Sequence, residues 1–302
     1  MKICMIGTGY VGLVSGTCFA DIGHQVYCVD KDVSKIDKLN SGVSIIYEPG
    51  LDELIQKNHK AKRLHFTSEL NKAVTVSDII FICVGTPNIK GSLKVNLSYV
   101  YKSIKEILSI TKKKKIIVTK STVPVGTGDE IEKIIKKKKK LFSIISNPEF
   151  LREGEAIRDF KYPDRIVVGS NSKQEFKLMK KLYGPLINKG AKFFTTSRRG
   201  AELIKYTANA FLATKITFIN EIANLCEQSG INVEDVALGI GSDSRIGGRF
   251  LRAGPAYGGS CFPKDTKGLV HAADKYKTNL SIVKSVIKSN YERVDFLTKR
   301  VH

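Results

Sequence analysis

The sequence of 302 residues lacks any apolar run of the roughly 18 residues that a helix needs to span a bilayer. Its six cysteines form no CxxC pair, so we expect neither a disulfide framework nor a zinc or other metal site. The first residues show no leader pattern, and internal repeats are absent. We therefore expect a cytoplasmic protein without a membrane partner.

Arginine is scarce for so basic a chain. The net charge is +21, but only 11 of the 50 basic residues are arginines, and bidentate phosphate or base recognition favours arginine. The lysine runs 112–115 and 136–140 fall where helices should end, where they complement helix dipoles. A solvated lysine face is the favoured interpretation, general attraction to polyanions is the alternative, and no specific nucleic acid partner is expected.

The first two thirds of the chain alternate short apolar runs with helical patterns, which is typical of a parallel sheet with crossover helices. The central runs are almost wholly apolar, as expected for strands covered on both faces. We predict strands at residues 3–6, 25–29, 64–66, 79–84, 116–119, 142–145 and 166–168.

The pattern changes after Arg199. Apolar residues at helical spacing predict one long helix over residues 202–229, followed by helices from Val233, from about Asp265 and from Ser281. We therefore predict an α/β, Rossmann-type domain at residues 1–198, followed by an all-helical domain with a long central helix at residues 199–302.

A glycine fingerprint opens the first predicted helix. Gly7, Gly9 and Gly12 directly follow the first strand, where a dinucleotide fold needs a tight turn, room for pyrophosphate and close helix packing. The second strand ends at Asp30, whose carboxylate would bind the adenosine ribose and repel a 2′-phosphate. These features favour NAD over NADP as the cofactor.

Three further strand ends carry polar residues, at the sheet edge where open α/β sheets bind ligands. Thr86 and Thr122 are either ligand contacts or ordinary residues of proline turns. Glu149 and Glu153 lie four residues apart and would share one face of a helical turn. On the long helix, Lys205 and Asn209 share a face; the lysine either serves acid–base chemistry or extends to solvent.

Cys261 lies in a glycine-rich loop that leads into a helix, next to Lys264. A thiol at a helix N-terminus near a cation should have a lowered pKa, and the glycines leave space for a substrate. An alcohol dehydrogenase that stops at the aldehyde needs no thiol, whereas oxidation on to the acid does, through a thioester. The alternative is a structural cysteine, which is how we interpret the other five.

Taken together, these segments resemble the UDP-glucose/GDP-mannose dehydrogenases, a family of nucleotide-sugar 6-dehydrogenases. The segments that carry the resemblance run in family order along nearly the whole chain: residues 7–12, 84–87, 121–126, 147–154, 205–209, 245–247 and 250–265.

The resemblance implies a role for each matching residue. Cys261 would be the nucleophile, Lys205 and Asp265 would move protons through a water beside Thr122, Asn209 would contact the sugar, and Glu149 would assist thioester hydrolysis. The matches to cofactor contacts are Gly7, Gly9, Tyr10, Val11, Gly12, Asp30, Lys35, Thr86, Thr122, Glu153 and Lys264. The matches to substrate contacts are Glu149, Phe150, Leu151, Glu153, Lys205, Asn209, Arg245, Phe250, Leu251, Gly254, Gly258 and Cys261, with Arg245 reaching the neighbouring subunit's substrate.

The implied reaction converts UDP-glucose, two NAD and water into UDP-glucuronate and two NADH, in a homodimer formed through the long helix. The family's third domain, which closes over UDP, has no counterpart before His302. Two alternatives stay open: a sister activity on UDP-N-acetylmannosamine or GDP-mannose, and a truncated NAD-binding remnant without activity.

Overall fold

The computed structural model describes residues 1–89, 91–92, 94–136 and 141–301. These residues form two compact units. The first comprises residues 1–86 and 96–205, and the second residues 87–95 and 206–302. Within the described ranges, no helix combines the length and apolar character required to cross a membrane.

The first unit is an eight-stranded sheet, counted over the described residues, with the strand order β3-β2-β1-β4-β5-β6-β7-β8. All neighbouring strands are parallel except β6 and β7, which pair antiparallel at Ser146 and Gly169. The elements are β1 (Lys2–Ile6), α1 (Tyr10–Asp21), β2 (Gln25–Val29), α2 (Val33–Asn40), α3 (Leu51–Lys60), β3 (Leu64–Thr67), α4 (Leu70–Val76), β4 (Ile79–Ile82), α5 (Ser98–Ile110), β5 (Lys115–Thr119), α6 (Thr127–Ile135), β6 (Phe142–Ser146), α7 (Ala156–Lys161), β7 (Arg165–Gly169), α8 (Lys173–Leu182), α9 (Gly184–Ile187) and β8 (Lys192–Thr196).

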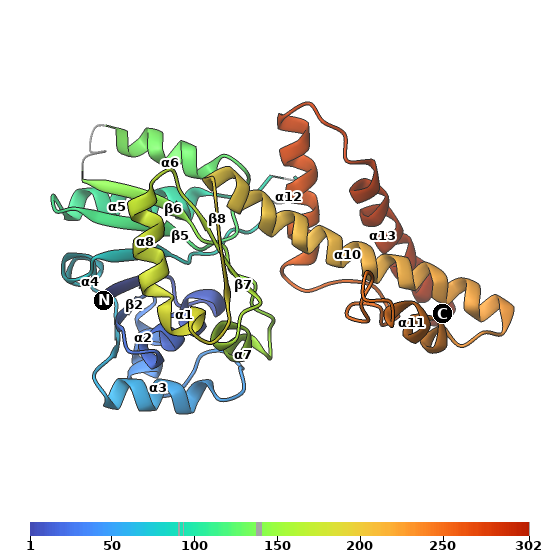
Figure 1. Cartoon of the computed structure of the whole chain (residues 1–302), viewed down its shortest axis with the longest axis horizontal. Helices are drawn as coiled ribbons and strands as arrows, with labels where there is room; N and C mark the ends of the chain where they lie inside the picture. Colours follow the sequence, from blue (N-terminus) through green and yellow to red (C-terminus); the bar gives the residue numbers. More distant parts are fainter. Residues whose placement is uncertain (90, 93, 137–140, 302) are drawn as a thin grey trace. The chain divides into compact units, whose positions relative to one another are not determined.

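Helices cover both faces of this sheet (Figure 1). Alternate strand residues point into two apolar layers, as period-2 side chains must. One layer packs against α1, α3, α7 and α8, with Phe19 and Phe81 completely buried. The other packs against α4, α5 and α6 around Ile80 and Ile104. The buried strands explain the almost wholly apolar runs in the sequence.

The predicted Rossmann-type sheet and the helical region after it are confirmed, with two differences among the strands. The β4 strand ends at Ile82, two residues earlier than expected. The β8 strand was not among the predicted strands, because it lies at the sheet edge and keeps only intermediate or exposed residues. Such an edge strand lacks the apolar run that identified the others.

The long helix α10 spans Arg198–Ser229 and begins four residues before the predicted start. Gly200 had argued against helix there, since glycine is unfavourable in a helix interior. A Cβ at Gly200 would lie 2.3 Å from Thr196 Oγ1. The glycine thus leaves room for the Thr196 side chain at the end of β8 and does not end the helix.

The second unit is helical. It contains α10 from Tyr206 onward, α11 (Val233–Gly241), α12 (Phe262–Lys275) and α13 (Ser281–Val301). The α12 helix begins at Phe262, three residues before the expected start, because Pro263 occupies its first turn, where a missing N–H costs nothing. Helices α11 and α13 begin where the sequence predicted.

The lysine run 112–115 is not wholly a solvated face. Lys115 lies within β5 and is only 6% exposed. Its Nζ donates hydrogen bonds to the carbonyl oxygens of Thr75 and Ser77 at the end of α4. The cation thus compensates the C-terminus of α4 and not that of α5, the helix that the run follows, and it does so on a buried side chain. Of the second run, residues 137–140 lie outside the described residues.

Candidate active site

The glycine turn after β1 has the three properties of a dinucleotide-binding loop. Gly7 has a φ of +98°, and a Cβ at Gly12 would lie 1.9 Å from the carbonyl oxygen of Gly7. A Cβ at Gly9, in contrast, would meet no atom within 4 Å. Gly7 and Gly12 are thus required by the fold itself, whereas Gly9 leaves open space at the N-terminus of α1, where a pyrophosphate binds.

Asp30 follows β2 and faces this turn. Its Oδ2 accepts hydrogen bonds from the backbone N–H of Thr8 at 2.9 Å and from Thr8 Oγ1 at 2.8 Å. Partial burial would raise the pKa of Asp30, but the donors from Thr8 and Asp32 lower it below its usual value. The carboxylate is therefore ionised and held in place, with capacity left to accept ribose hydroxyls. Lys35, half-buried in the first turn of α2, adds a positive charge nearby.

These residues fit NAD, because the open position at Gly9 and the ionised Asp30 provide for a pyrophosphate and a ribose respectively. The structure also links the two threonine turns. The hydroxyl of Thr86 donates to the backbone oxygen of Thr122 at 2.9 Å, and Ser121 Oγ donates to the oxygen of Val84 at 2.7 Å. The ends of β4 and β5 therefore form one rigid edge beside the glycine turn.

Glu48 is a buried carboxylate that the sequence did not single out. It accepts a short hydrogen bond from Tyr10 OH, in the first turn of α1, and bonds from the N–H groups of Gly154 at 2.9 Å and Ile157 at 3.3 Å. It thereby joins the fingerprint helix to the loop that carries Glu153, which is itself exposed. The helix residue Val11 next to Tyr10 is half-buried.

A buried ion pair lies at the carboxyl end of the sheet. Glu149 Oε1 is 3.0 Å from Lys205 Nζ, and both side chains are almost completely buried. The other oxygen, Oε2, accepts the N–H of Leu151. Burial would raise the pKa of Glu149, but Lys205 and this hydrogen bond hold it below its usual value. Glu149 is consequently an ionised, oriented carboxylate.

The aromatic ring of Phe150 lies against two cations. The Arg165 guanidinium is 4.1 Å and Lys205 Nζ 5.3 Å from its centroid. These cation–π contacts restrict the orientation of the lysine that already pairs with Glu149. Phe150 and Leu151 are half-buried, so the segment is fixed and partly accessible.

Glu202, one turn before Lys205 on α10, is a second buried carboxylate that the sequence analysis missed. It accepts the N–H groups of Gly126 at 2.7 Å and Gly128 at 2.8 Å, together with Ser146 Oγ at 3.0 Å. It therefore ties α10 to the start of α6 and to the end of β6. Burial raises the pKa of Glu202 to about 7, against the opposing effect of its N–H donors.

In the second unit, Cys261 is the N-cap residue of α12 and is exposed, whereas the other five cysteines are buried. One turn further on, Asp265 is completely buried. Its carboxylate accepts a bond from Asn209 Nδ2 at 2.6 Å and pairs with Lys264 Nζ at 2.5 Å. The start of α12 thus presents an accessible thiol, and one turn further on it carries a carboxylate that the Asn209 amide of α10 and the Lys264 ammonium group hold in place.

The loop before Cys261 combines a buried residue with exposed positions. Phe250 has a φ of +65°, and the next residue, Leu251, is buried. Gly258, three residues before the cysteine, is exposed, and a Cβ there would meet nothing within 4 Å. Arg245 precedes this loop in the sequence. Its side chain is 87% exposed, and its guanidinium pairs with Asp243. Its side chain extends into solvent in this single chain.

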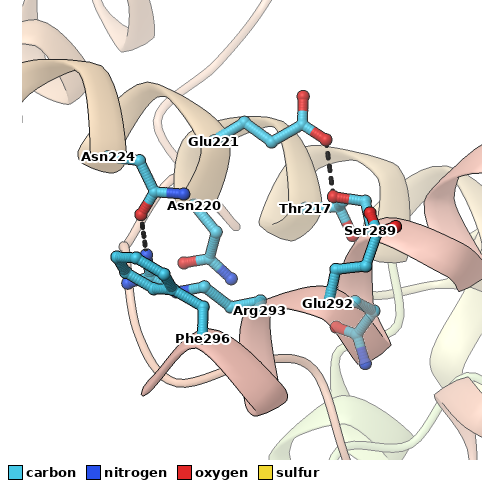
Figure 2. Close-up of a pocket in the computed structure, with 9 residues that line it drawn as sticks. Thr217, Asn220, Glu221, Asn224, Ser289, Glu292, Arg293 and Phe296 are labelled. Atoms are coloured by element: carbon cyan, nitrogen blue, oxygen red, sulfur yellow. Dashed lines mark hydrogen bonds between the residues drawn. The ribbon is translucent and has the colours of Figure 1, made fainter. Parts of the chain in front are cut away.

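Residues of helices α10 and α13 line a pocket of about 270 Å³, and two of them bind the backbone of this loop (Figure 2). Asn220 Oδ1 accepts the N–H of Gly254 at 2.8 Å, and Arg293 Nε donates to the oxygen of Gly254 at 3.2 Å. A short hydrogen bond from Arg293 to Asn224 completes this wall. The pocket walls therefore fix the backbone of a residue predicted to bind substrate.

The predicted residues thus form two groups. The first unit holds the glycine turn, Asp30, the threonine turns, Glu149 and Lys205. The second holds Asn209, the anchored loop, Cys261, Lys264 and Asp265. Helix α10 carries Lys205 in one group and Asn209 in the other. Among the residues that the structure describes, no group of three or more His, Cys, Asp or Glu side chains is arranged to hold a metal ion.

Alanine substitutions at Gly9 and Gly12 should have opposite effects on cofactor binding and on stability. Gly9→Ala should leave the melting temperature unchanged but weaken NAD binding at least about tenfold, because the added methyl enters open space where the cofactor passes. Gly12→Ala should instead cost about 1–3 kcal/mol of unfolding free energy, since its methyl overlaps the Gly7 carbonyl. Thermal melting and NAD titration calorimetry measure both; a Gly9→Ala protein with wild-type NAD affinity would contradict the assignment.

The raised pKa of Glu202 should make the stability of the fold depend on pH. Its folded pKa of about 7 exceeds the ordinary 4.5, so the native state binds the extra proton between these values. The unfolding free energy should therefore fall, by up to about 3 kcal/mol, as pH rises from about 4.5 to about 7. Urea unfolding at pH 5 to 8 should show this loss in the wild type and in the exposed control Glu53→Gln, but not in Glu202→Gln. Parallel curves for all three proteins would refute the assignment.

Comparison with known proteins gives the family. Residues 1–187 match the model of the UDP-glucose/GDP-mannose dehydrogenase family, NAD binding domain, and residues 199–292 match that family's central domain. The chain is 54% identical over 306 residues to UDP-glucose 6-dehydrogenase of Rhizobium meliloti (strain 1021), covering all of this chain and 70% of that protein.

Solved structures give the same result. A UDP-glucose dehydrogenase from the archaeon Pyrobaculum islandicum aligns with a TM-score of 0.91 and 35% identity, over 96% of this chain and 68% of that one. A UDP-D-ManNAc dehydrogenase from Pyrococcus horikoshii aligns with a TM-score of 0.89 and 26% identity, over 99% and 70%. The chain therefore belongs to the UDP-glucose/GDP-mannose dehydrogenase family and carries its NAD-binding domain.

Proposed function

We propose that this chain catalyses the NAD-dependent, four-electron oxidation of UDP-glucose to UDP-glucuronate, with Cys261 as the covalent nucleophile. The observation that carries the proposal is the accessible thiol of Cys261 at the start of α12, one turn from the buried Asp265–Asn209–Lys264 group. Residues 1–198 would bind NAD, and residues 199–302 would supply the nucleophile.

The first oxidation requires a base for the proton of the sugar's 6-hydroxyl group. Lys205 accepts that proton through a water molecule, and Asn209 and Asp265 orient the sugar and stabilise the developing alkoxide. Bound NAD supplies a hydride acceptor for each of the two oxidation steps. Thr86, Thr122, Glu153 and Lys264 hold the cofactor side of the site.

The second oxidation depends on the thiol. Cys261 Sγ, as thiolate, adds to the aldehyde carbon, and the carbonyl oxygen takes up a proton to give a thiohemiacetal. Loss of a hydride and of the hydroxyl proton leaves a thioester on the same sulfur. Glu149 then directs a water molecule to the thioester carbonyl, the C–S bond breaks, and the thiol and the carboxylate product are released. The ionised, buried state of Glu149 suits this last role.

UDP-glucose is favoured over related sugars by the 54% identity to a relative of that name. The alternative is UDP-N-acetylmannosamine or GDP-mannose, and the structural similarity to a UDP-D-ManNAc dehydrogenase supports keeping it. NADH formation with each of the three sugars discriminates among these substrates. A chain that binds NAD but oxidises none of them would be the inactive remnant.

We also propose that the enzyme forms a homodimer through α10. Phe211, Phe218 and Leu225 recur every seven residues on this helix and are 64%, 49% and 64% exposed. Three large apolar side chains in one exposed stripe are typical of a helix-pairing surface. In such a dimer the exposed Arg245 would reach the partner's substrate. The six free cysteines support a reducing, cytoplasmic location.

Replacing the nucleophile tests the reaction. Cys261→Ser should lower UDP-glucuronate formation at least about a thousandfold, because a serine hydroxyl does not replace the thiolate as nucleophile or leaving group. NAD affinity should stay within about twofold, and Cys226→Ala, which removes a buried thiol of α10, should keep full turnover. Product analysis by chromatography and NAD titration measure these effects; undiminished acid formation by Cys261→Ser would rule out the thioester.

Replacing the central residue of the stripe tests the dimer. Phe218→Glu should weaken self-association by about 2 kcal/mol or more, roughly thirtyfold, since it puts a charge into an apolar interface. Ile282→Glu, at a position of α13 that is 71% exposed, against 49% for Phe218, serves as the control. Sedimentation equilibrium should show dissociation of Phe218→Glu only. A wild-type chain that is monomeric at high concentration would refute the dimer.

A further inference from the structure

Lys120 is a buried lysine that the mechanism above does not use. It follows β5, is 4% exposed, and lies within hydrogen-bond reach of Tyr183 OH at 3.4 Å. Tyr183 OH itself donates to Asn147 Oδ1 at 2.6 Å, so it accepts from the lysine. Removing an ammonium group from water costs several kcal/mol unless other charges compensate it.

Three titratable groups besides Tyr183 act on Lys120, each from a different element. They are Cys83 after β4, Glu149 after β6 and Lys205 on α10. Burial lowers the pKa of Lys120 to about 8, while Cys83 and Glu149 oppose this shift and Lys205 reinforces it. At pH 7 the side chain is therefore mainly charged. In turn, Lys120 contributes to keeping Glu149 ionised.

The charge balance of this cluster depends on Lys120. Glu149 and protonated Lys205 alone form a neutral pair, and a buried neutral pair resists losing a proton, because the loss leaves an unpaired carboxylate. With Lys120 charged, the three groups carry one net positive charge. The cluster becomes neutral when Lys205 gives up its proton, and a low-dielectric interior favours that neutral state.

We propose that Lys120 is a positioning residue whose positive charge allows Lys205 to release its proton while Glu149 stays ionised. Lys205 is then a neutral amine that accepts the proton of the sugar hydroxyl through water: the hydroxyl O–H bond breaks, and an N–H bond forms on Lys205. Lys120 compensates the charge of Glu149 throughout and transfers no proton. This inference rests on the proposed role of Lys205 in UDP-sugar oxidation.

The pH profile of kcat/KM for UDP-glucose tests the proposal. In Lys120→Met the acid limb should move to higher pH by at least about one unit, so that activity at pH 7 falls about tenfold and recovers in alkaline buffer. Lys120→Arg keeps the charge and should keep the limb in place. Lys115→Met is the matched control, because Lys115, at the start of β5, is also a buried lysine but faces the end of α4. It should lower the melting temperature without moving the limb.

Two results would overturn the proposal. One is an unmoved acid limb in folded Lys120→Met and Lys120→Gln proteins. The other is a loss of activity in Lys120→Arg as large as in Lys120→Met at every pH, which would make Lys120 itself the proton-transfer group.

A second readout does not depend on turnover. In NAD-free protein carrying ¹³C-labelled lysine, the Lys205 Cε resonance, assigned with Lys205→Arg, should titrate at higher pH in Lys120→Met than in wild type. An unchanged midpoint would overturn the proposal even if the chain proved inactive. If the midpoint differs between the two proteins as expected but wild-type protein oxidises no nucleotide sugar, the result would count against the proposed function alone.

Discussion

The ion pair between Glu149 and Lys205 sets the main constraint on the first unit. Two charges are held 3.0 Å apart out of contact with water, and losing either partner of such a pair typically costs about 3–5 kcal/mol. Neighbouring groups hold the pair in place. The Leu151 N–H binds Glu149, the Phe150 ring lies against Lys205, and Lys120 adds a positive charge that compensates Glu149. The sheet makes the arrangement possible, because its strand order brings the ends of β4, β5 and β6 to one edge.

In the second unit, the main constraint is that one thiol stays accessible while the residues around it are held in place. Asp265 is completely buried under Cys261 and is held by Asn209 and Lys264. The loop before the cysteine is tied down through Gly254 by Asn220 and Arg293. Glycines at exposed positions, such as Gly258, then leave the approach to the sulfur open without loosening the loop. Rigid support with a clear approach is what covalent catalysis requires.

The sequence predicted the sheet, the long helix and the exposed state of Cys261 because each has a short-range signal: apolar runs, helical periodicity, or a glycine loop that meets a proline-started helix. It missed β8, whose edge position leaves no apolar run. It also placed the start of α10 late, because Gly200 reads as a helix breaker although it lies in the first turn of α10, against Thr196 at the end of β8. Three buried charged residues were missed for a common reason: Glu48, Lys120 and Glu202. From sequence alone, a charged residue is expected at the surface, and only the fold shows that it is buried. Two signals were present, however, because Lys120 directly follows a buried strand with the apolar centre Ile116-Ile117-Val118, and Glu202 lies one turn before Lys205.

The claim on which the functional account depends is that the sulfur of Cys261 carries the substrate carbon between the two oxidations. Peptide mass spectrometry of acid-quenched Glu149→Gln protein during turnover with UDP-glucose and NAD examines this directly, because slow hydrolysis should let the acyl-enzyme accumulate. The account predicts that the peptide containing Cys261 gains the mass of the oxidised nucleotide sugar as a thioester. An unmodified Cys261 peptide, found while UDP-glucuronate is being formed, would contradict it.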